Sequence, residues 1–259
     1  MKPVFPVACI TLFTSLSGCA QDYSLAPPVD SEQMTITVKV PEELEAKPLQ
    51  ALYRSVSCKR VIRDDRGRRV VRDGHHEIKA QLKLQRQGQS DLYQTTLPVN
   101  GGGACKWHLA NVTFGVAYSY PTRFGENVTY GAGGGVVVMF DQDNSPSGGA
   151  DIKVEGDLTI KKDYYPWVSE AFTGGYHKRA SLAGEGPISL KYQAPQARKV
   201  YFEPVLHSGL TVYSVQPNEK TQGNHTRFIY PDGSIVADGR SEPNFRKLEV
   251  IRKAAQVNQ

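Results

Sequence analysis

The chain has 259 residues, of which 39% are hydrophobic and 22% charged, and this apolar content excludes a wholly disordered chain. A mean hydropathy of -0.42, with no apolar run of about 18 residues, excludes a protein that crosses a membrane several times. The net charge of +5 is too small to indicate nucleic acid by itself, and aromatic residues do not alternate with the basic ones, so we expect no nucleic-acid partner.

Residues 1–18 have the pattern of a signal peptide, with Lys2 followed by a short apolar stretch at residues 4–14. The stretch ends in Leu16-Ser17-Gly18-Cys19, which resembles the lipobox of bacterial lipoproteins. The resemblance implies cleavage before Cys19, followed by acylation of its thiol and its new amine. Three acyl chains would suffice for stable anchoring in a membrane. The alternative is an ordinary secretory signal followed by a chance cysteine.

The residue after the lipobox cysteine is Ala20 rather than aspartate. In the sorting rule of enterobacterial lipoproteins, which the resemblance brings in, this implies an outer-membrane anchor with the protein facing the periplasm. We interpret residues 19–33 as a lipidated, proline-containing polar tether and residues 34–259 as a β-rich periplasmic domain.

Two cysteines remain once Cys9 leaves with the signal peptide and Cys19 carries lipid, namely Cys58 and Cys105. An even pair in an oxidising compartment predicts a disulfide, which closes a long loop and contributes about 4 kcal/mol in the chain-entropy model. The alternative is a metal site that includes His75, His76 and His108. No metal-ligand spacing supports it, so we expect no metal.

Alternating apolar and polar residues between turn signals indicate many short strands. We expect them at residues 34–40, 52–61, 78–84, 92–97, 106–120, 136–140, 151–160, 187–192, 199–205, 211–215, 226–230, 234–237 and 245–251. Helical turns are expected only at residues 41–47 and 167–172.

This pattern predicts an all-β, mainly antiparallel fold with little helix, either a β-sandwich or an Ig-like domain. Cys58, Cys105 and the neighbouring Trp107 loosely match the Ig core of a bridge and a tryptophan. The Gly-, Ser- and Asn-rich stretch 121–150 suggests a possible division into two packed β subdomains.

The segment from Lys59 to Arg86 holds most of the positive charge, and its centre at residues 63–69 is typical of an exposed hairpin tip. Such a hairpin could bind an acidic protein surface or anionic lipid headgroups. The alternative is a solvated hairpin whose arginines pair with its own aspartates. The partner-binding candidates in this hairpin are Arg63, Arg66, Arg68 and Arg69.

Aromatic residues form a second candidate surface, because tyrosine and tryptophan are favoured in protein interfaces. The cluster Tyr164-Tyr165-Pro166-Trp167 is interpreted as a possible docking surface, although tyrosine is also common in buried strands.

Sequence motifs for a catalytic nucleophile are absent from residues 19–259, which contain no G-x-S-x-G, S-x-x-K or H-E-x-x-H pattern. We therefore identify no catalytic residue and no cofactor, and expect that the protein is not an enzyme.

The segments Leu52–Cys58 and Tyr93–Leu109, with Leu97, Cys105 and Trp107 in the second, resemble small enterobacterial lipoproteins. Those lipoproteins are encoded beside phospholipase effectors of type VI secretion and act as their immunity proteins. The resemblance covers about sixty residues and the lipobox. It implies a protein partner, a secreted phospholipase, which the chain would bind and neutralise in the periplasm.

Three functions are therefore compared. The first is a membrane-anchored immunity protein, which requires a stoichiometric protein partner and no turnover. The alternative is a structural or assembly lipoprotein of the envelope or of a secretion or surface apparatus. The third is an enzyme acting on glycan or lipid, for which the sequence offers no convincing pair of catalytic groups.

The lipobox leads to a direct prediction. Changing Cys19→Ala removes the thiol that accepts lipid, so palmitate labelling should be lost and the protein should leave the membrane fraction. Continued palmitate labelling of this variant would contradict the interpretation.

Overall fold

The computed structural model describes residues 22–141, 152–172, 174–219 and 223–257, and in these ranges the chain forms two β-sheets. The ten-stranded sheet contains β1 (Gln33–Lys39), β5 (Gln85–Arg86), β6 (Leu92–Pro98), β9 (Val128–Tyr130), β12 (Leu158–Ala171), β13 (His177–Ala183), β15 (Lys199–Leu206), β16 (Val212–Val215), β17 (Arg227–Ile229) and β18 (Ile235–Val236). The eight-stranded sheet contains β2 (Leu44–Ala46), β3 (Leu49–Arg63), β4 (Arg69–Leu82), β7 (Asn100–Gly102), β8 (Trp107–Tyr118), β10 (Gly134–Met139), β11 (Ile152–Lys153) and β14 (Ser189–Gln193). A short 3-10 helix, η1 (Pro121–Phe124), and one α-helix, α1 (Phe245–Val257), complete these elements.

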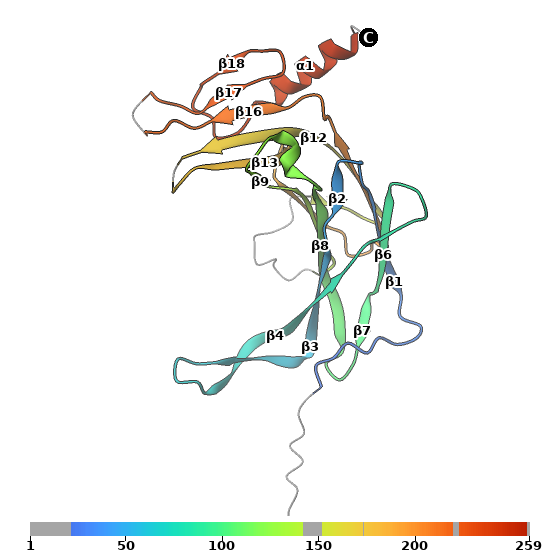
Figure 1. Cartoon of the computed structure of the whole chain (residues 1–259). Coiled ribbons are helices and arrows are strands. Elements are labelled where there is room, and N and C mark those ends of the chain that lie inside the picture. The colour runs from blue at the N-terminus through green and yellow to red at the C-terminus, as the bar shows by residue number, and fades with distance from the viewer. Residues whose placement is uncertain (1–21, 142–151, 173, 220–222, 258–259) are drawn as a thin grey trace, which may run out of the picture.

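The two sheets pack face to face as a β-sandwich, which confirms the predicted all-β class (Figure 1). Alternate residues of β1, beginning with Met34 and Ile36, are fully buried between the sheets, as a strand with one buried face requires. Phe114 of β8 and Phe202 of β15 meet edge to face, with ring centroids 6.2 Å apart. The core therefore joins strands that are distant in sequence.

Antiparallel strand pairs outnumber parallel ones in the described ranges, as predicted, but the sheets are mixed. β1, β15, β12 and β16 run parallel to their neighbours in this order, and β10 runs parallel to β14. Parallel neighbours cannot be joined by a hairpin, so the chain crosses between sheets to connect them. The stretch 121–150, where a subdivision was expected, contributes β9 to one sheet and β10 to the other.

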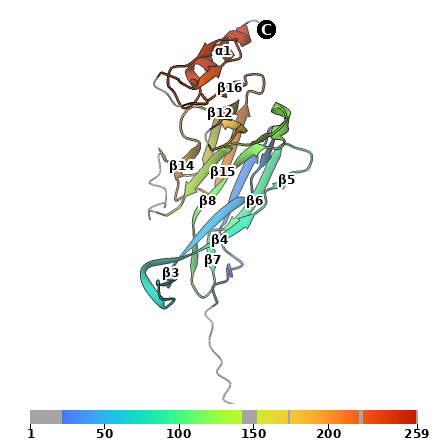
Figure 2. The same ribbon diagram turned by 60° about the vertical axis from the view of Figure 1, so that its left-hand side comes forward.

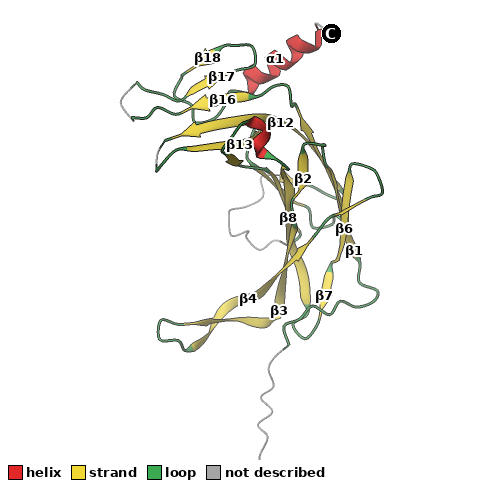
Figure 3. Ribbon diagram, in the orientation of Figure 1, coloured by secondary structure: helices red, strands yellow, loops and turns green. Residues whose placement is uncertain are grey.

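One end of the ten-stranded sheet extends beyond the sandwich as a distal arm, defined here as the part of β12 from Tyr165 onward with β9, β13, β16–β18 and α1 (Figures 1 and 3). A second, smaller core lies in this arm and contains Tyr165, Val212, Phe228, Tyr230 and Leu248. Because β12 runs without a break through both cores, the arm is a continuation of the sandwich.

The segment predicted as a strand at residues 245–251 is the start of α1. Phe245, Leu248 and Ile251 recur at helical spacing, and all three belong to the core of the distal arm. The helix has an N-cap, because the side chain of Asn244 accepts the backbone N–H of Lys247 at 3.2 Å. No helix in the described ranges combines the length and apolar character needed to span a membrane.

The predictions of helical turns at residues 41–47 and 167–172 are both wrong. Residues 167–172 fall largely in β12, which pairs with β13 and β16, and residues 41–47 include β2, which pairs with β8. In both places strand pairing prevails over a weak helical pattern.

Part of the segment interpreted as a tether is packed against the sandwich. Tyr23 and Leu25 contact the main core, and Ala26 bridges to Gly102, its N–H donating to the carbonyl of Gly101 at 2.9 Å. The glycines at 101–103, which suggest a simple loop in the sequence, permit this close approach. We call residues 23–31 the docked N-terminal segment.

Gly102 provides a test of this docking. Its φ of +57° favours glycine, and a Cβ there would overlap the carbonyl oxygen of Ala26. Gly88 is a matched control, because its φ of +59° is similar but a Cβ there meets no atom within 4 Å. Gly102→Ala should therefore speed amide hydrogen exchange in the docked N-terminal segment, whereas Gly88→Ala should cost only about 1 kcal/mol in stability without this effect. Equal exchange of that segment in the two variants would contradict the docking.

Candidate binding surfaces

The arginines predicted at a hairpin tip do lie on one exposed hairpin, formed by the ends of β3 and β4. We define the basic hairpin as residues 59–71, which hold six cationic side chains against Asp64 and Asp65. The hairpin leaves the sandwich sideways, at the end of the molecule opposite α1 (Figures 1 and 2). Its exposed cationic residues are Lys59, Arg60, Arg63, Arg66, Arg68 and Arg69.

Two bulges bend the basic hairpin away from its sheet. The register passes from Ser55 opposite His76 to Lys59 opposite His75, so β3 holds three additional residues there. The next pair is Arg60 opposite Arg72, so residues 73–74 bulge from β4. Bulges turn a strand and increase its twist, and this accounts for the direction of the hairpin.

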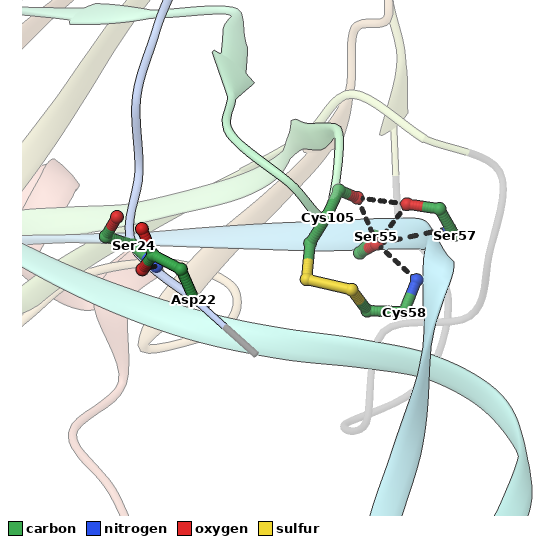
Figure 4. The surroundings of a disulfide bond; sticks show 6 residues. All are labelled: Asp22, Ser24, Ser55, Ser57, Cys58 and Cys105. Atoms are coloured by element: carbon green, nitrogen blue, oxygen red, sulfur yellow. Dashed lines mark hydrogen bonds between the residues drawn. A yellow bond between two sulfur atoms is a disulfide. The ribbon is translucent and has the colours of Figure 1, made fainter. Parts of the chain in front are cut away.

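The predicted disulfide between Cys58 and Cys105 is confirmed and lies in the first bulge, with its Cα atoms 5.2 Å apart (Figure 4). The hydroxyl of Ser55 accepts the N–H of Cys58 at 2.9 Å and donates to the carbonyl of Cys105, which also accepts the Ser57 hydroxyl at 2.7 Å. Cys105 lies two residues before β8, which pairs with β3, so the bridge joins neighbours of one sheet, whereas the Ig bridge joins two sheets. The sandwich therefore lacks the Ig pattern.

Arg54 directly precedes Ser55 on β3, and its side chain points to the opposite face of the strand. Its guanidinium donates to Glu77 of β4 at 2.9 Å and to Asp141, which follows β10. A buried cation held by two carboxylates is costly to disturb. The base of the basic hairpin is thus secured on one face by sulfur and hydroxyl groups, and on the other by an ion-pair network.

One carboxylate of the basic hairpin is occupied inside its own turn. Asp64 accepts the backbone N–H groups of Arg66 and Arg68 and the Arg68 guanidinium, at 2.8–3.0 Å. These bonds, led by the backbone N–H of Arg68, hold the pKa of Asp64 below its usual value. The prediction that the hairpin's charges pair internally therefore applies to Arg68 alone among its described cations, because Lys59, Arg60, Arg63, Arg66 and Arg69 form no ion pair.

The predicted aromatic docking cluster is mostly buried, which corrects that prediction. Tyr164 and Tyr165 are 1% and 2% exposed and lie on opposite faces of β12, one in each core. Trp167 packs against the second core, and its indole N–H donates to Ser214 at 2.8 Å. Tyr165 and Trp167 therefore hold the distal arm together, whereas Tyr164 belongs to the main core.

Other tyrosines of the same arm are exposed and share a face of its sheet. Tyr130 lies opposite Ala180, Ala180 opposite Val168, and Val168 opposite Tyr213, in one row across β9, β13, β12 and β16. Residues directly opposite each other in a sheet present their side chains on the same face. Tyr130 is 56% and Tyr213 41% exposed, whereas Val168 and Ala180 between them are buried.

The next row of this face holds an ion pair. Lys178 of β13 lies opposite Glu170 of β12, and the Lys178 Nζ is 2.9 Å from the Glu170 Oε1. The Glu170 carboxylate raises the pKa of Lys178, and Tyr176 and Tyr213 lie close enough to contribute to the same shift. Tyr176 is 56% exposed. We call Tyr130, Tyr176 and Tyr213, with this ion pair, the tyrosine face. Tyr165 and Trp167 lie on the opposite side of the sheet, and α1 packs on that opposite side.

The structure bears differently on the predicted lipidation site and on the alternative metal site. Cys19, the predicted lipidation site, lies outside the described residues. In the ranges that the structure describes, no group of three or more His, Cys, Asp or Glu residues could hold a metal ion. The Cys58–Cys105 disulfide also occupies the two thiols that the metal alternative required.

Comparisons with family models, with curated proteins and with solved structures give no match for this chain. Its function must therefore be inferred from the geometry of the two surfaces.

The tyrosines that stand out in the sequence are not the exposed ones of the arm. The motif Tyr164-Tyr165-Pro166-Trp167 stands out as a run, but adjacent residues of a strand cannot all share one face. Tyr130 and Tyr213 are far apart in sequence, and only the register of β9, β13, β12 and β16 brings them onto one face, while Tyr176 directly precedes β13.

The disulfide leads to a stability prediction. Replacing both Cys58 and Cys105 by alanine should lower the free energy of unfolding by about 4 kcal/mol, because the unfolded chain regains the freedom of a long closed loop. Urea denaturation of the variant and the oxidised wild type measures the difference. Amide exchange in the basic hairpin should also become faster, because its base loses a constraint. An unchanged urea midpoint and slope would contradict the first expectation, and unchanged amide exchange in the hairpin would contradict the second.

Proposed function

We propose that this chain is an outer-membrane lipoprotein, anchored through Cys19, that binds and neutralises a secreted antibacterial effector in the periplasm. The observation that carries the proposal is the tyrosine face, a set of exposed phenol rings on and directly beside one sheet. The resemblance to immunity lipoproteins supports the class of partner, a phospholipase delivered by type VI secretion. The lipobox supports the anchor.

The chemistry of the tyrosine face suits a protein partner. Tyrosine contributes a large contact area at low cost in side-chain entropy, and it can donate a hydrogen bond from its rim. Tyr130 already uses its hydroxyl to hold the carbonyl of Ser119 at 3.1 Å, which fixes its ring before any partner arrives. Lys178 and Glu170 add a positive and a negative group for orientation.

The position of this face also suits capture of a soluble protein. The distal arm and the blue segment at the start of the described chain lie at opposite ends of the molecule in two views (Figures 1 and 2). A chain anchored at its N-terminus would therefore present the tyrosine face on the part farthest from the anchor, where an incoming effector meets it first.

A contact competition on solid medium tests the proposal. A deletion strain is grown against its parent, with and without a functional secretion apparatus in the parent. The deletion strain should die only when the parent can secrete, and the wild-type gene should restore its survival. Equal survival in both cases would contradict immunity and favour the assembly role.

The same assay locates the binding surface. Replacing Tyr130, Tyr176 and Tyr213 by alanine should abolish protection, because central aromatic contacts of an interface each contribute about 2 kcal/mol or more to binding. The matched control replaces Ile235 and Val250, which are 58% and 66% exposed elsewhere on the arm, by alanine and should still protect. Membrane levels of both variants are compared by immunoblot. Full protection by the tyrosine variant would show that effector binding lies elsewhere.

A further inference from the structure

The basic hairpin is not explained by capture of an effector at the tyrosine face, because it lies at the other end of the molecule (Figures 1 and 2). It lies instead beside the start of the described chain. The ring of Tyr23 contacts the ring of His76 of β4 at a tilt, with centroids 4.8 Å apart, and the His76 ring in turn lies 5.8 Å from that of Trp107. The docked N-terminal segment therefore begins at the base of the basic hairpin.

This placement sets the distance from the proposed anchor. Asp22 is three residues after Cys19, and a fully extended chain of that length spans about 10 Å. Because Tyr23 and Leu25 are packed against the core, the slack between acyl chains and fold is limited to this short link. Acylation of Cys19, on which this inference rests, would hold the hairpin end of the molecule close to the bilayer surface.

The charge of the basic hairpin matches such a surface. Five of its cationic side chains, at positions 59, 60, 63, 66 and 69, are exposed and form no ion pair within the described chain. Asp64 is occupied by the turn itself, so Asp65 is the hairpin's remaining carboxylate. Clustered arginines close to a membrane are attracted to anionic headgroups, within about a Debye length of 8–10 Å.

The pairing inside the basic hairpin is unfavourable for a free ribbon in water. Arg63 lies directly opposite Arg69, and like charges in that arrangement destabilise a strand pair. Val71 is 59% exposed, and its cross-strand partner Val61 is only half-buried. Phosphate groups around the arginines, with apolar side chains at the headgroup level, would relieve both costs.

We propose that the basic hairpin is a membrane-contacting element that binds the headgroups of anionic phospholipids in the bilayer that holds the acyl chains. It forms a second attachment beside Cys19. The lipids are recognised through their phosphate charge, and the two bulges at the base of the hairpin set its angle to the sandwich.

The first experiment uses the full acylated protein in phosphatidylcholine vesicles with and without phosphatidylglycerol. Trypsin cleaves after exposed arginines, so the rates of cleavage at positions 63, 66 and 69 report access to the hairpin. We expect cleavage at least about tenfold slower with phosphatidylglycerol, and recovery in high salt. Arg179 and Arg227, exposed on the distal arm, are internal controls whose cleavage should not slow. Equal hairpin cleavage in both kinds of vesicle would overturn the proposal.

The second experiment separates the hairpin from the anchor. The Cys19→Ser protein, which cannot be acylated, is sedimented with phosphatidylglycerol vesicles at low salt. Reversing three charges (Arg63→Glu, Arg66→Glu and Arg69→Glu) should reduce partitioning by about 100-fold or more, since each basic residue near an anionic surface contributes about fivefold. The matched control makes the same reversals at Arg179, Arg227 and Arg246, which are exposed on the distal arm, and should change partitioning by less than about threefold. Equal losses in the two variants would reduce the effect to net charge and overturn the proposal.

Other results distinguish this inference from the proposed function. If the wild-type protein fails to float with pure phosphatidylcholine vesicles, anchoring through Cys19 is wrong. The sedimentation experiment still tests lipid binding by the basic hairpin. If the hairpin variant partitions like the wild type but no longer protects cells in competition, the hairpin binds a protein, and the lipid proposal is wrong.

Discussion

The register of β12 is the constraint on which both cores of the molecule depend. Its first half places Leu158 and Ile160 in the main core, and its second half places Tyr165 in the core of the distal arm. Tyr164 and Tyr165 are adjacent, point to opposite faces and are both buried, so a shift of one residue would exchange the two cores. Such a shift would expose buried side chains of both cores, so the register of β12 fixes the position of the arm relative to the sandwich.

The basic hairpin has no comparable core. A two-stranded ribbon is marginally stable by itself in water, and this one carries arginines opposite each other. Its geometry therefore depends on its base, where the disulfide, the Ser55 hydroxyl and the buried Arg54 act on the same few residues of β3. The charged ribbon is exposed at the cost of intrinsic stability, and the covalent link limits that cost.

The sequence predicts the features that depend on the local residue pattern. It fails where contacts with segments distant in sequence determine the structure. Alternation locates most strands, and cysteine counting yields the bridge. In contrast, residues 245–251 contain enough β-branched and aromatic side chains to suggest a strand, although Phe245, Leu248 and Ile251 at helical spacing after Asn244 indicate the helix. The tyrosine face has no local signal at all, because it is assembled by the register of four strands.

The proposed lipid contact and the proposed effector contact support each other physically. A protein held by acyl chains through a short link can still tilt, and its distal arm would sample many orientations. A second contact through the basic hairpin removes part of that freedom before any partner arrives, so effector binding does not bear that entropy loss. It also holds the distal arm at a distance from the bilayer. An effector that attacks phospholipid must approach the same surface, where an oriented binding face has a higher effective concentration than a tumbling one.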